Sequence, residues 1–270
     1  MLYICPTPIG NLEDITIRVL NVLKRADVIA CEDTRHSKRL LTHYEIHKPL
    51  ISLHEHNEKQ RSEEVLSLLR SGKEVAFISD AGMPGIQDPG YFLIQRMVRE
   101  GLKYTVLPGA SAAITALVAS NLASKEFFFE GFLPRKTGEQ KERLRALKDL
   151  QAPFILYEAP GRVSSTLKNA LEVLGDRKIA VLRELTKIHE EYLHTTLSEY
   201  LILENKVEKG EFVLIIEGAT QGEKVYLEEE IVALLKHHIE EGSSRKDAVK
   251  KVMELTGLPK NKIYPLSLDL

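Results

Sequence analysis

Short apolar runs alternate with helical patterns over the first half of the chain. The runs suit buried strands and fall at residues 2–5, 28–31, 50–53, 75–78 and 103–107. Helical spacing of apolar residues predicts helices at residues 12–26, 37–44, 58–70, 91–98 and 112–119. In the first helix, Ile17, Leu20 and Leu23 share one face, with Val19 beside them. Such alternation produces βαβ units, so we expect an α/β fold with a mainly parallel N-terminal sheet.

The pattern changes after about residue 120. Further strand-like runs fall at residues 127–132, 154–158, 178–182, 192–196 and 212–216, and helical patterns at residues 137–150 and 163–174. We expect a second α/β domain with a mixed sheet. From about residue 226 the pattern is helical only. The chain should therefore divide into residues 1–118, residues 119–222 and a helical C-terminal module at residues 223–270.

The C-terminal module contains two helical patterns, at residues 227–241 and 245–256, and a last short segment at residues 260–268. Two helices around a glycine-containing turn resemble a helix-turn-helix. Between residues 244 and 262, six basic residues face two acidic ones, a net charge of +4. A solvated basic face or a nucleic-acid contact would each explain this charge.

Composition narrows the classes of function. The 270-residue chain is 43% hydrophobic and 28% charged, with a net charge of −2, so nucleic acid would have to bind local basic patches. The N-terminus lacks a signal-peptide pattern and no apolar run reaches the length of a membrane span, which favours the cytoplasm. Cys5 and Cys31 should be buried, reduced thiols. The histidines lack metal-binding spacing, so we expect no metal site.

One glycine-rich loop, residues 78–90, connects a predicted strand to a predicted helix. Ligands of open α/β sheets bind at such strand ends. The loop has neither the P-loop sequence nor the G-x-G-x-x-G spacing, and a simple turn with helix-capping aspartates remains an alternative. Its two carboxylates, Asp80 and Asp88, favour a ligand held by backbone groups and acidic side chains.

Several such loops should meet at one edge of the sheet. They contain Gly10, the sequence from Glu32 to Arg35, residues 78–90 and the sequence from Pro108 to Ser111. The resulting cleft would be rich in glycine, small side chains and carboxylates, and would lack the basic residues that a nucleoside triphosphate needs. S-adenosylmethionine fits this composition better. The small-residue helix at residues 112–119 suits close packing on a sheet, a backbone N-terminus open to a ligand, or both.

An ordered series of motifs resembles one known family. The motifs are TPIGNLEDIT at residues 7–16, CEDTR at 31–35, the 78–90 loop, PGASA at 108–112, FEGFLP at 129–134, YEAPGR at 157–162 and RELTK at 183–187. They resemble the tetrapyrrole-methylase superfamily and, more narrowly, bacterial ribosomal RNA ribose 2′-O-methyltransferases that modify a cytidine in the decoding region of small-subunit (16S) rRNA. Ala159 stands where members usually carry serine, and Met83 where related C-methylases often carry aspartate.

The resemblance implies a two-domain tetrapyrrole-methylase-like fold, the class III methyltransferase fold, with S-adenosylmethionine in the cleft and a homodimer. By position, the methyl donor would contact Gly10, Asp80, Gly82, Met83, Ile86, Gly109, Ser111 and Ala112. In this frame Asp80 should face the ligand, whereas Asp88 should cap the following helix.

The implied reaction is in-line attack of a ribose 2′-hydroxyl on the methyl group, with positioning supplying most of the rate. The candidate proton acceptors are Asp33, Glu158, Glu184 and Lys187, and each also suits a structural ion pair such as Asp33–Arg35 or Glu184–Lys187. Phosphate contacts are expected from Arg35, Lys38, Arg39, Arg135 and Lys136. The expected partner is small-subunit rRNA or the assembled small subunit. A tetrapyrrole-precursor C-methyltransferase and a non-catalytic RNA-binding protein are the alternatives.

Overall fold

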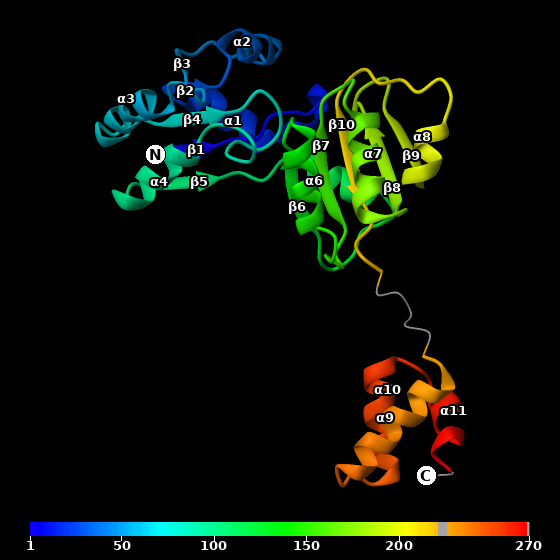
Figure 1. The fold of residues 1–270 in the computed structure, drawn as a ribbon. Helices are drawn as coiled ribbons and strands as arrows, with labels where there is room; N and C mark the ends of the chain where they lie inside the picture. The colour runs from blue at the N-terminus through cyan, green and yellow to red at the C-terminus, as the bar shows by residue number, and fades with distance from the viewer. Residues whose placement is uncertain (221–225, 269) are drawn as a thin grey trace. The chain divides into compact units, whose positions relative to one another are not determined.

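The structure is a computed structural model that describes residues 1–220, 226–268 and 270. It contains two compact units, Met1–Ala219 and Thr220–Leu270 (Figure 1). The first unit holds two five-stranded sheets with their helices. The predicted boundary between residues 118 and 119 lies inside this unit and stays a prediction, whereas the one between residues 222 and 223 lies outside the described residues.

The first sheet is entirely parallel, in the order β3-β2-β4-β1-β5. Its strands are β1 (Leu2–Ile4), β2 (Val28–Cys31), β3 (Leu50–Ser52), β4 (Val75–Ile78) and β5 (Tyr104–Val106). Every residue of central β4 is buried, as expected for a strand covered on both faces. The predicted parallel sheet is confirmed, with strand ends that match the predicted ones or differ from them by one residue.

Helices cover both faces of this parallel sheet. On one face, α1 (Ile17–Arg25) and α2 (Thr34–His43) contribute Val19, Leu23 and Leu41 to a core with β1, β2 and β4. On the other, α3 (Glu58–Arg70) and α4 (Tyr91–Arg99) pack against the same strands. Because all five strands are parallel, their carboxyl ends lie at one edge of the sheet, where the long loops emerge.

The first helix is shorter than its pattern predicts. A 3-10 turn η1 (Leu12–Asp14) is followed by Thr16, whose side chain accepts a hydrogen bond from the backbone N–H of Val19 and starts α1. The predicted apolar face was wrong for Ile17, which is 78% exposed, because the buried face consists of Val19, Val22 and Leu23. Helix α2 starts earlier than predicted, since Asp33 caps it.

The second sheet is mixed, which confirms the prediction, and has the order β6-β7-β10-β8-β9. Its strands are β6 (Phe128–Phe132), β7 (Phe154–Glu158), β8 (Lys178–Arg183), β9 (Glu191–Thr196) and β10 (Phe212–Ile216). Only β6 and β7 pair in parallel, and the other pairs are antiparallel. One face is covered by α6 (Thr137–Ala146), α7 (Val163–Leu174) and α8 (Leu197–Ile202), the last of which the apolar pattern missed.

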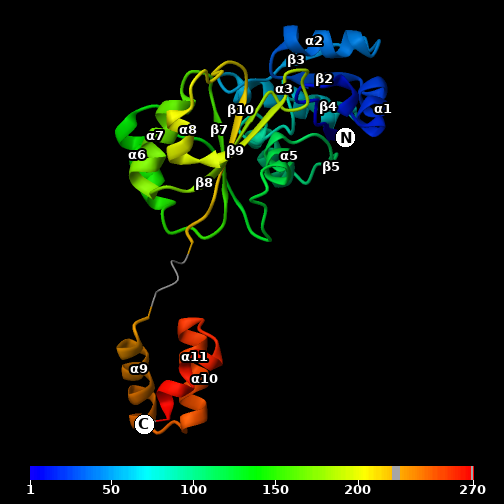
Figure 2. The ribbon, with the colours of Figure 1, turned by 90° about the vertical axis from the view of Figure 1, so that its right-hand side faces the viewer.

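The opposite face of the mixed sheet is covered by α5 (Ala112–Ala119), which packs against β10 (Figure 2). Ala113, Ala116 and Leu117 of α5 are buried there together with Ile9 and Leu185. The close packing predicted for this small-residue helix is confirmed. Because Ile9 follows β1, this cluster joins the loops of the first sheet to the second sheet.

The second unit has a core of its own. Its elements are α9 (Glu228–Glu240), α10 (Arg245–Thr256), α11 (Lys260–Ile263) and η2 (Pro265–Ser267). Ile231, Leu235, Val252 and Ile263 are among the residues buried between them. Gly257, in the left-handed region with φ of 70°, ends α10.

The cysteines and the helix lengths of the structure can be compared with the predictions. Both cysteines are free and buried, as predicted, and burial raises the pKa of the Cys5 thiol to about 12. The thiol therefore stays protonated and unreactive. Among the described residues, none of the helices combines the length and apolar character needed to cross a bilayer.

Candidate active site

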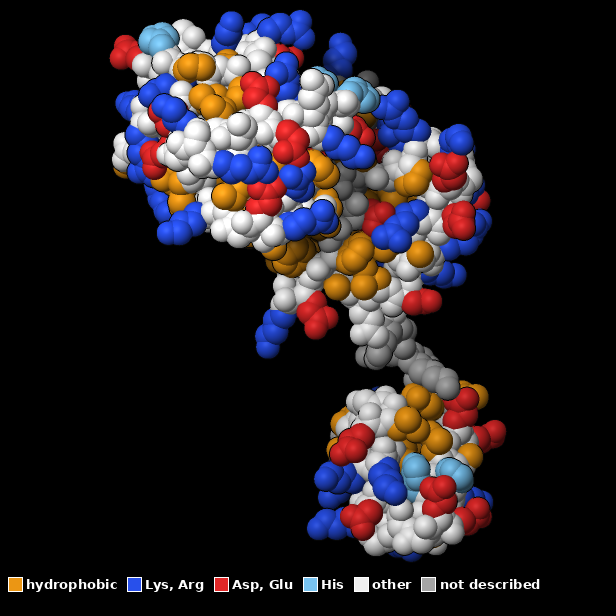
Figure 3. Space-filling view, turned by 90° about the vertical axis from the view of Figure 1, so that its left-hand side faces the viewer, with side chains coloured by type: hydrophobic (Ala, Val, Ile, Leu, Met, Phe, Trp, Pro, Cys, Tyr) orange, Lys and Arg blue, Asp and Glu red, His pale blue; other side chains and the backbone are white. Residues whose placement is uncertain are grey.

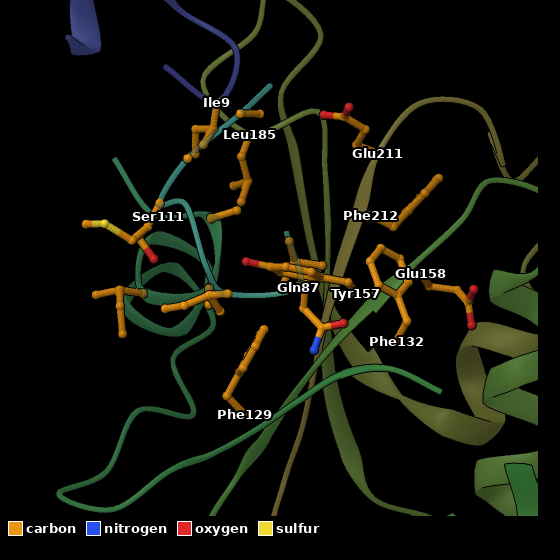
Figure 4. Close-up of a pocket in the computed structure, with 18 of the residues that line it drawn as sticks. Ile9, Gln87, Ser111, Phe129, Phe132, Tyr157, Glu158, Leu185, Glu211 and Phe212 are labelled. Atoms are coloured by element: carbon orange, nitrogen blue, oxygen red, sulfur yellow. The ribbon is translucent and has the colours of Figure 1, made fainter. Parts of the chain in front are cut away.

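A pocket of about 590 Å³ lies where the loops of the first sheet meet the second sheet (Figure 4). The first half of the chain contributes Ile9, residues 81–83, residues 86–88 and residues 111–114. The second sheet and its adjoining segments contribute Phe127, Phe129, Phe132, residues 157–160, Leu185 and residues 211–213. The 78–90 loop and the loop after β5 therefore meet at this pocket as predicted, whereas Gly10 and the sequence from Glu32 to Arg35 are not among its lining residues.

The glycine-rich loop is held near both ends by contacts of its glycines. Gly82 exchanges two backbone hydrogen bonds with Thr7, at 2.9 and 3.0 Å, which fastens the loop to the segment after β1. Gly90 has φ of 123°, and a Cβ there would lie 2.4 Å from Cε1 of Phe77. A side chain at Gly90 would have to displace a fully buried aromatic ring.

The middle of the loop contacts the second sheet. The side chain of Gln87 packs on Gly131, where a Cβ would come within 2.4 Å of Nε2 of Gln87. Gly131 lies at a register shift between β6 and β7, and Gln87 adopts a positive φ of 62°. Bulges of this kind commonly redirect side chains near functional sites.

Aromatic side chains form the wall of the pocket on the second sheet. Phe129 and Phe132 of β6 each meet Tyr157 of β7 edge-on, with ring centroids 5.2 and 5.6 Å apart (Figure 4). Such pairs stabilise one another and give a rigid apolar surface. The pocket therefore has an aromatic wall formed by β6 and β7.

A strained turn after β8 forms another wall. Glu184 and Thr186 have φ of 52° and 65°, in the left-handed region that side chains avoid. Nζ of Lys187 lies 3.0 Å from Oε1 of Glu184 and 2.9 Å from Oε2 of Glu211, which fixes the turn. The turn packs on Gly10, where a Cβ would lie 2.6 Å from the carbonyl oxygen of Leu185.

The predicted ligand contacts fall into two groups. Gly82, Met83, Ile86, Ser111 and Ala112 line the pocket. Gly10, Asp80 and Gly109 are not among the lining residues: Gly10 supports the strained turn, Gly109 packs against Pro6, and Oδ1 of Asp80 accepts a hydrogen bond from the backbone N–H of Asp33 at 3.2 Å. The structure thus gives these three residues supporting contacts, and ligand contact by any of the eight stays a prediction.

All four predicted proton acceptors take part in ion pairs, and three of them have shifted pKa values. Asp33 pairs with Arg35, and hydrogen bonds from the side chain and backbone of Arg35 lower the pKa of Asp33. A backbone hydrogen bond from Glu211, together with Lys187, lowers the pKa of Glu184. Although desolvation opposes the effect, Glu211 and Glu184 raise the pKa of Lys187. At neutral pH these groups are ionised and are weak proton acceptors.

The fourth predicted acceptor, Glu158, lines the pocket at the end of β7. Its carboxylate accepts hydrogen bonds from Oγ1 of Thr166 at 2.6 Å and from the backbone of Ala159 at 2.8 Å, and Arg162 lies 3.4 Å away. Figure 4 draws this carboxylate pointing away from Gln87 and Ser111. These contacts anchor Glu158 to α7.

The prediction that Asp88 caps α4 was wrong. Glu58, at the start of α3, supplies the cap: its Oε1 accepts hydrogen bonds from the backbone N–H groups of Gly90 and Phe92 at 2.8 and 3.0 Å. Asp88 lines the pocket instead. Burial, followed by the charges of Glu32 and Asp80, raises the pKa of Asp88 to about 7. The position of Asp88 just before Pro89 and α4 suggested a cap. The sequence alone could not show that Glu58, 32 residues before Gly90, occupies that place.

The residues predicted to contact RNA lie on the surface of the first unit. Arg35, Lys38, Arg39, Arg135 and Lys136 are all exposed, the first three on α2 and the others before α6. No group of three or more His, Cys, Asp or Glu side chains within the described ranges is arranged to hold a metal ion.

The sequence of the whole chain is similar to those of known proteins. The profile of the tetrapyrrole (corrin/porphyrin) methylases matches residues 1–201. The ribosomal RNA small subunit methyltransferase I of Bacillus subtilis (strain 168) is 45% identical over 98% of this chain and 92% of its own length. The chain belongs to this methyltransferase I family. The Synechocystis member is 41% identical over the whole chain and 98% of its own length.

Solved structures of distantly related methyltransferases have the same fold as this chain. A cobalt precorrin-4 methyltransferase matches with a TM-score of 0.58 at 19% identity, over 80% of this chain and 94% of its own. A uroporphyrin-III C-methyltransferase from Thermus thermophilus, solved with S-adenosyl homocysteine, matches with a TM-score of 0.56 at 18% identity, over 79% and 96%. At these identities the likeness establishes the shared tetrapyrrole-methylase fold and confirms the predicted fold class.

Proposed function

We propose that this chain transfers the methyl group of S-adenosylmethionine to the ribose 2′-hydroxyl of a cytidine in the decoding region of small-subunit (16S) rRNA. The observation that carries the proposal is the similarity, at 41–45% identity over nearly the whole chain, to proteins named ribosomal RNA small subunit methyltransferase I. The cytidine and the ribose oxygen follow from the motif resemblance.

The pocket suits S-adenosylmethionine in size and lining. Its volume of about 590 Å³ falls within the range of small-molecule sites. Tyr157, Phe129 and Phe132 offer surfaces for an adenine ring, and Gly82 and Met83 offer backbone groups. The only ionisable side chains among the described lining residues are Asp88, Tyr157, Glu158 and Glu211, which suits a cationic ligand. When bound, the donor would supply an activated methyl group.

Two exposed basic surfaces suit an RNA backbone. On α2, Arg35, Lys38 and Arg39 are exposed, and Lys and Arg side chains gather along the top of the first unit in Figure 3, where Figure 1 draws α2. In the second unit Arg245, Lys246, Lys250 and Lys251 are exposed on α10. Such residues contact phosphates without reading bases, so the target would be specified by the shape of the RNA or of the assembled subunit.

We further propose a cytoplasmic homodimer. Strand β5 is an edge strand of the parallel sheet, and its Tyr104 and Val106 are exposed. Apolar side chains on an edge strand favour association with another surface. Sedimentation analysis of the purified chain should give twice the monomer mass, and a Val106→Lys variant should shift the distribution toward monomer. A wild-type monomer at micromolar concentration would contradict this.

The alternative enzyme is a C-methyltransferase of a tetrapyrrole precursor, favoured by the shared fold with the precorrin and uroporphyrin enzymes. The deciding experiment offers labelled S-adenosylmethionine with three acceptors: small subunits from a strain lacking this gene, naked rRNA and a tetrapyrrole precursor. We expect label in the small subunits. Label in the tetrapyrrole alone would reject the proposal. Calorimetry without detectable binding of the methyl donor would favour a non-catalytic RNA-binding protein.

A further inference from the structure

Among the described residues, Asp88 is the one carboxylate of the pocket that is neither a helix cap nor paired with a basic side chain. It comes from the glycine-rich loop after β4 and is half-buried. Glu58 satisfies the N-terminus of α4, so Asp88 is free of the capping role that its sequence position suggests. Asp33, Glu184 and Glu158, by contrast, are each held by hydrogen bonds and by a cation.

The charged and titratable groups near Asp88 come from the loops after β2 and β4 and from the second sheet. Glu32 at the end of β2 and Asp80 after β4 are acidic, and Ser79 of the same loop is a hydrogen-bond partner. Tyr157 on β7 interacts with Asp88 electrostatically, and Glu158 and Glu211 line the same pocket. Within the described part of the chain, no Lys, Arg or His lines the pocket. This surrounding favours a carboxyl group that accepts a proton readily at neutral pH.

The backbone around Asp88 is fixed on both sides. Gln87, the preceding residue, packs on Gly131 of β6, and Gly90 is pressed against the ring of Phe77. Gln87 also has a positive φ of 62°. Backbone strain next to a pocket side chain is a feature of functional sites, where the surrounding packing supports it. Asp88 is therefore positioned by contacts to both sheets.

We propose that Asp88 is the general base that accepts the proton of the attacking ribose 2′-hydroxyl. The inference rests on the proposed ribose methylation. The ribose oxygen forms a bond to the methyl carbon while the carbon–sulfur bond breaks, and the bonding pair stays on sulfur. The hydroxyl proton moves to the carboxylate of Asp88. The sulfonium loses its positive charge as the carboxylate loses its negative charge, so no other reactant is required.

An Asp88→Asn variant tests this role, with the exposed Asp149→Asn as its matched control. We expect the Asp88 variant to lower kcat by about 10²- to 10⁴-fold. In the wild type, kcat/KM should rise with pH through a midpoint near the pKa of Asp88, about 7. This rise should disappear in the variant and persist in Asp149→Asn.

Two measurements separate the base from other roles. Carboxyl-carbon NMR without any ligand should show one aspartate titrating near neutral pH in the wild type and in Asp149→Asn, and none in Asp88→Asn. Calorimetry should give the same affinity for S-adenosylmethionine in all three proteins. A weaker affinity with unchanged kcat would make Asp88 an electrostatic partner of the methyl donor and overturn the proposal.

Labelling of small subunits by the wild type and by Asp88→Asn distinguishes a wrong general base from a wrong proposed function. If the wild type labels small subunits and Asp88→Asn does so at the same rate with the same pH profile, Asp88 is not the base although the function stands. If the wild type labels no RNA, the proposed function fails first.

Discussion

The carboxylates around the pocket differ in what stabilises their charge. Arg35 holds Asp33 and Lys187 holds Glu184, and both carboxyl groups have lowered pKa values. Asp88 has no such partner among the described residues, and burial beside Glu32 and Asp80 raises its pKa. The motif resemblance suggested Asp33, Glu158 and Glu184 as proton acceptors because they stand in its most recognisable motifs. Their ion pairs, which the sequence allowed as an alternative, are what the structure contains.

The raised pKa of Asp88 predicts a pH-dependent penalty to folding. The folded-state value of about 7 exceeds the ordinary 3.8, so between these values the folded protein keeps a proton that the unfolded chain has lost. Stability should therefore fall as pH rises from 3.8 to 7. Asp88→Asn should remove this fall and stabilise the protein at pH 8 by on the order of 1–2 kcal/mol, after a discount for solvent screening.

Denaturant unfolding of the wild type and Asp88→Asn between pH 4 and 8 checks this prediction. The difference in unfolding free energy should grow with pH and level off above 7. A difference that stays constant over this range would mean that the carboxyl group of Asp88 titrates at its ordinary pKa.

Gly10 is a second position where a single residue determines the geometry. A methyl group there would lie 2.6 Å from the backbone carbonyl of Leu185 and from Cγ of Lys187. Gly10→Ala should displace the strained turn, lower stability by about 1–3 kcal/mol and weaken binding of S-adenosylmethionine. Gly138→Ala is the control, because a Cβ at Gly138 would meet no atom within 4 Å.

Thermal melting and calorimetry of both glycine variants measure these effects. Gly138→Ala should melt at or slightly above the wild-type temperature, because alanine suits the first turn of α6 better than glycine. Equal stability of Gly10→Ala and the wild type would show that the turn adapts to the methyl group.

At the scale of elements, the loop at residues 78–90 connects β4 to α4 and carries much of the pocket. Apolar runs located its flanking strand and helix because β4 is buried along its whole length and α4 is amphipathic. The pattern could not identify Glu58 as the cap, because that contact joins residues 32 positions apart in the sequence. It also missed α8, a six-residue helix started by the capping box of Thr196 and Glu199.

Removing the Glu58 carboxylate should loosen this element. Glu58→Ala leaves the N–H groups of Gly90 and Phe92 without their acceptor, and we expect a loss of about 1–2 kcal/mol in unfolding free energy. Hydrogen exchange should accelerate at the start of α4. Glu55→Ala, at an exposed position nearby, serves as the control. Unchanged exchange at Gly90 and Phe92 in the Glu58 variant would contradict this assignment of the cap.

At the scale of the whole molecule, two units with separate cores suggest separate tasks. The first unit contains the pocket, and the second has a small helical core with an exposed basic helix. The sequence predicted this helical module because its apolar positions repeat with helical spacing. Its charge alone could not decide between a solvated face and an RNA contact.

Charge reversal on α10 tests the second unit. Lys246→Glu combined with Lys250→Glu should weaken methylation of small subunits and leave the affinity for S-adenosylmethionine unchanged, because phosphate contacts contribute additively to RNA binding. The matched control reverses the exposed Lys168 on α7 and Lys148 after α6. A KM for small subunits that is the same in both double variants would assign the basic face of α10 to solvation.

A chain that ends at Thr220 gives a second test at this scale. Because the first unit has its own core clusters, it should fold and bind S-adenosylmethionine with wild-type affinity while modifying RNA poorly. Equal loss of donor binding and RNA modification would mean that the second unit only stabilises the fold.

The position of the transferred methyl group shows whether this chain methylates a cytidine ribose. Small subunits lacking the modification are incubated with the wild-type chain and isotopically labelled S-adenosylmethionine, and the rRNA is digested to nucleosides for mass spectrometry. We expect one labelled nucleoside, a cytidine with the label on its ribose. Label on a base, or no label in small-subunit rRNA under conditions where S-adenosylmethionine binds, would contradict it.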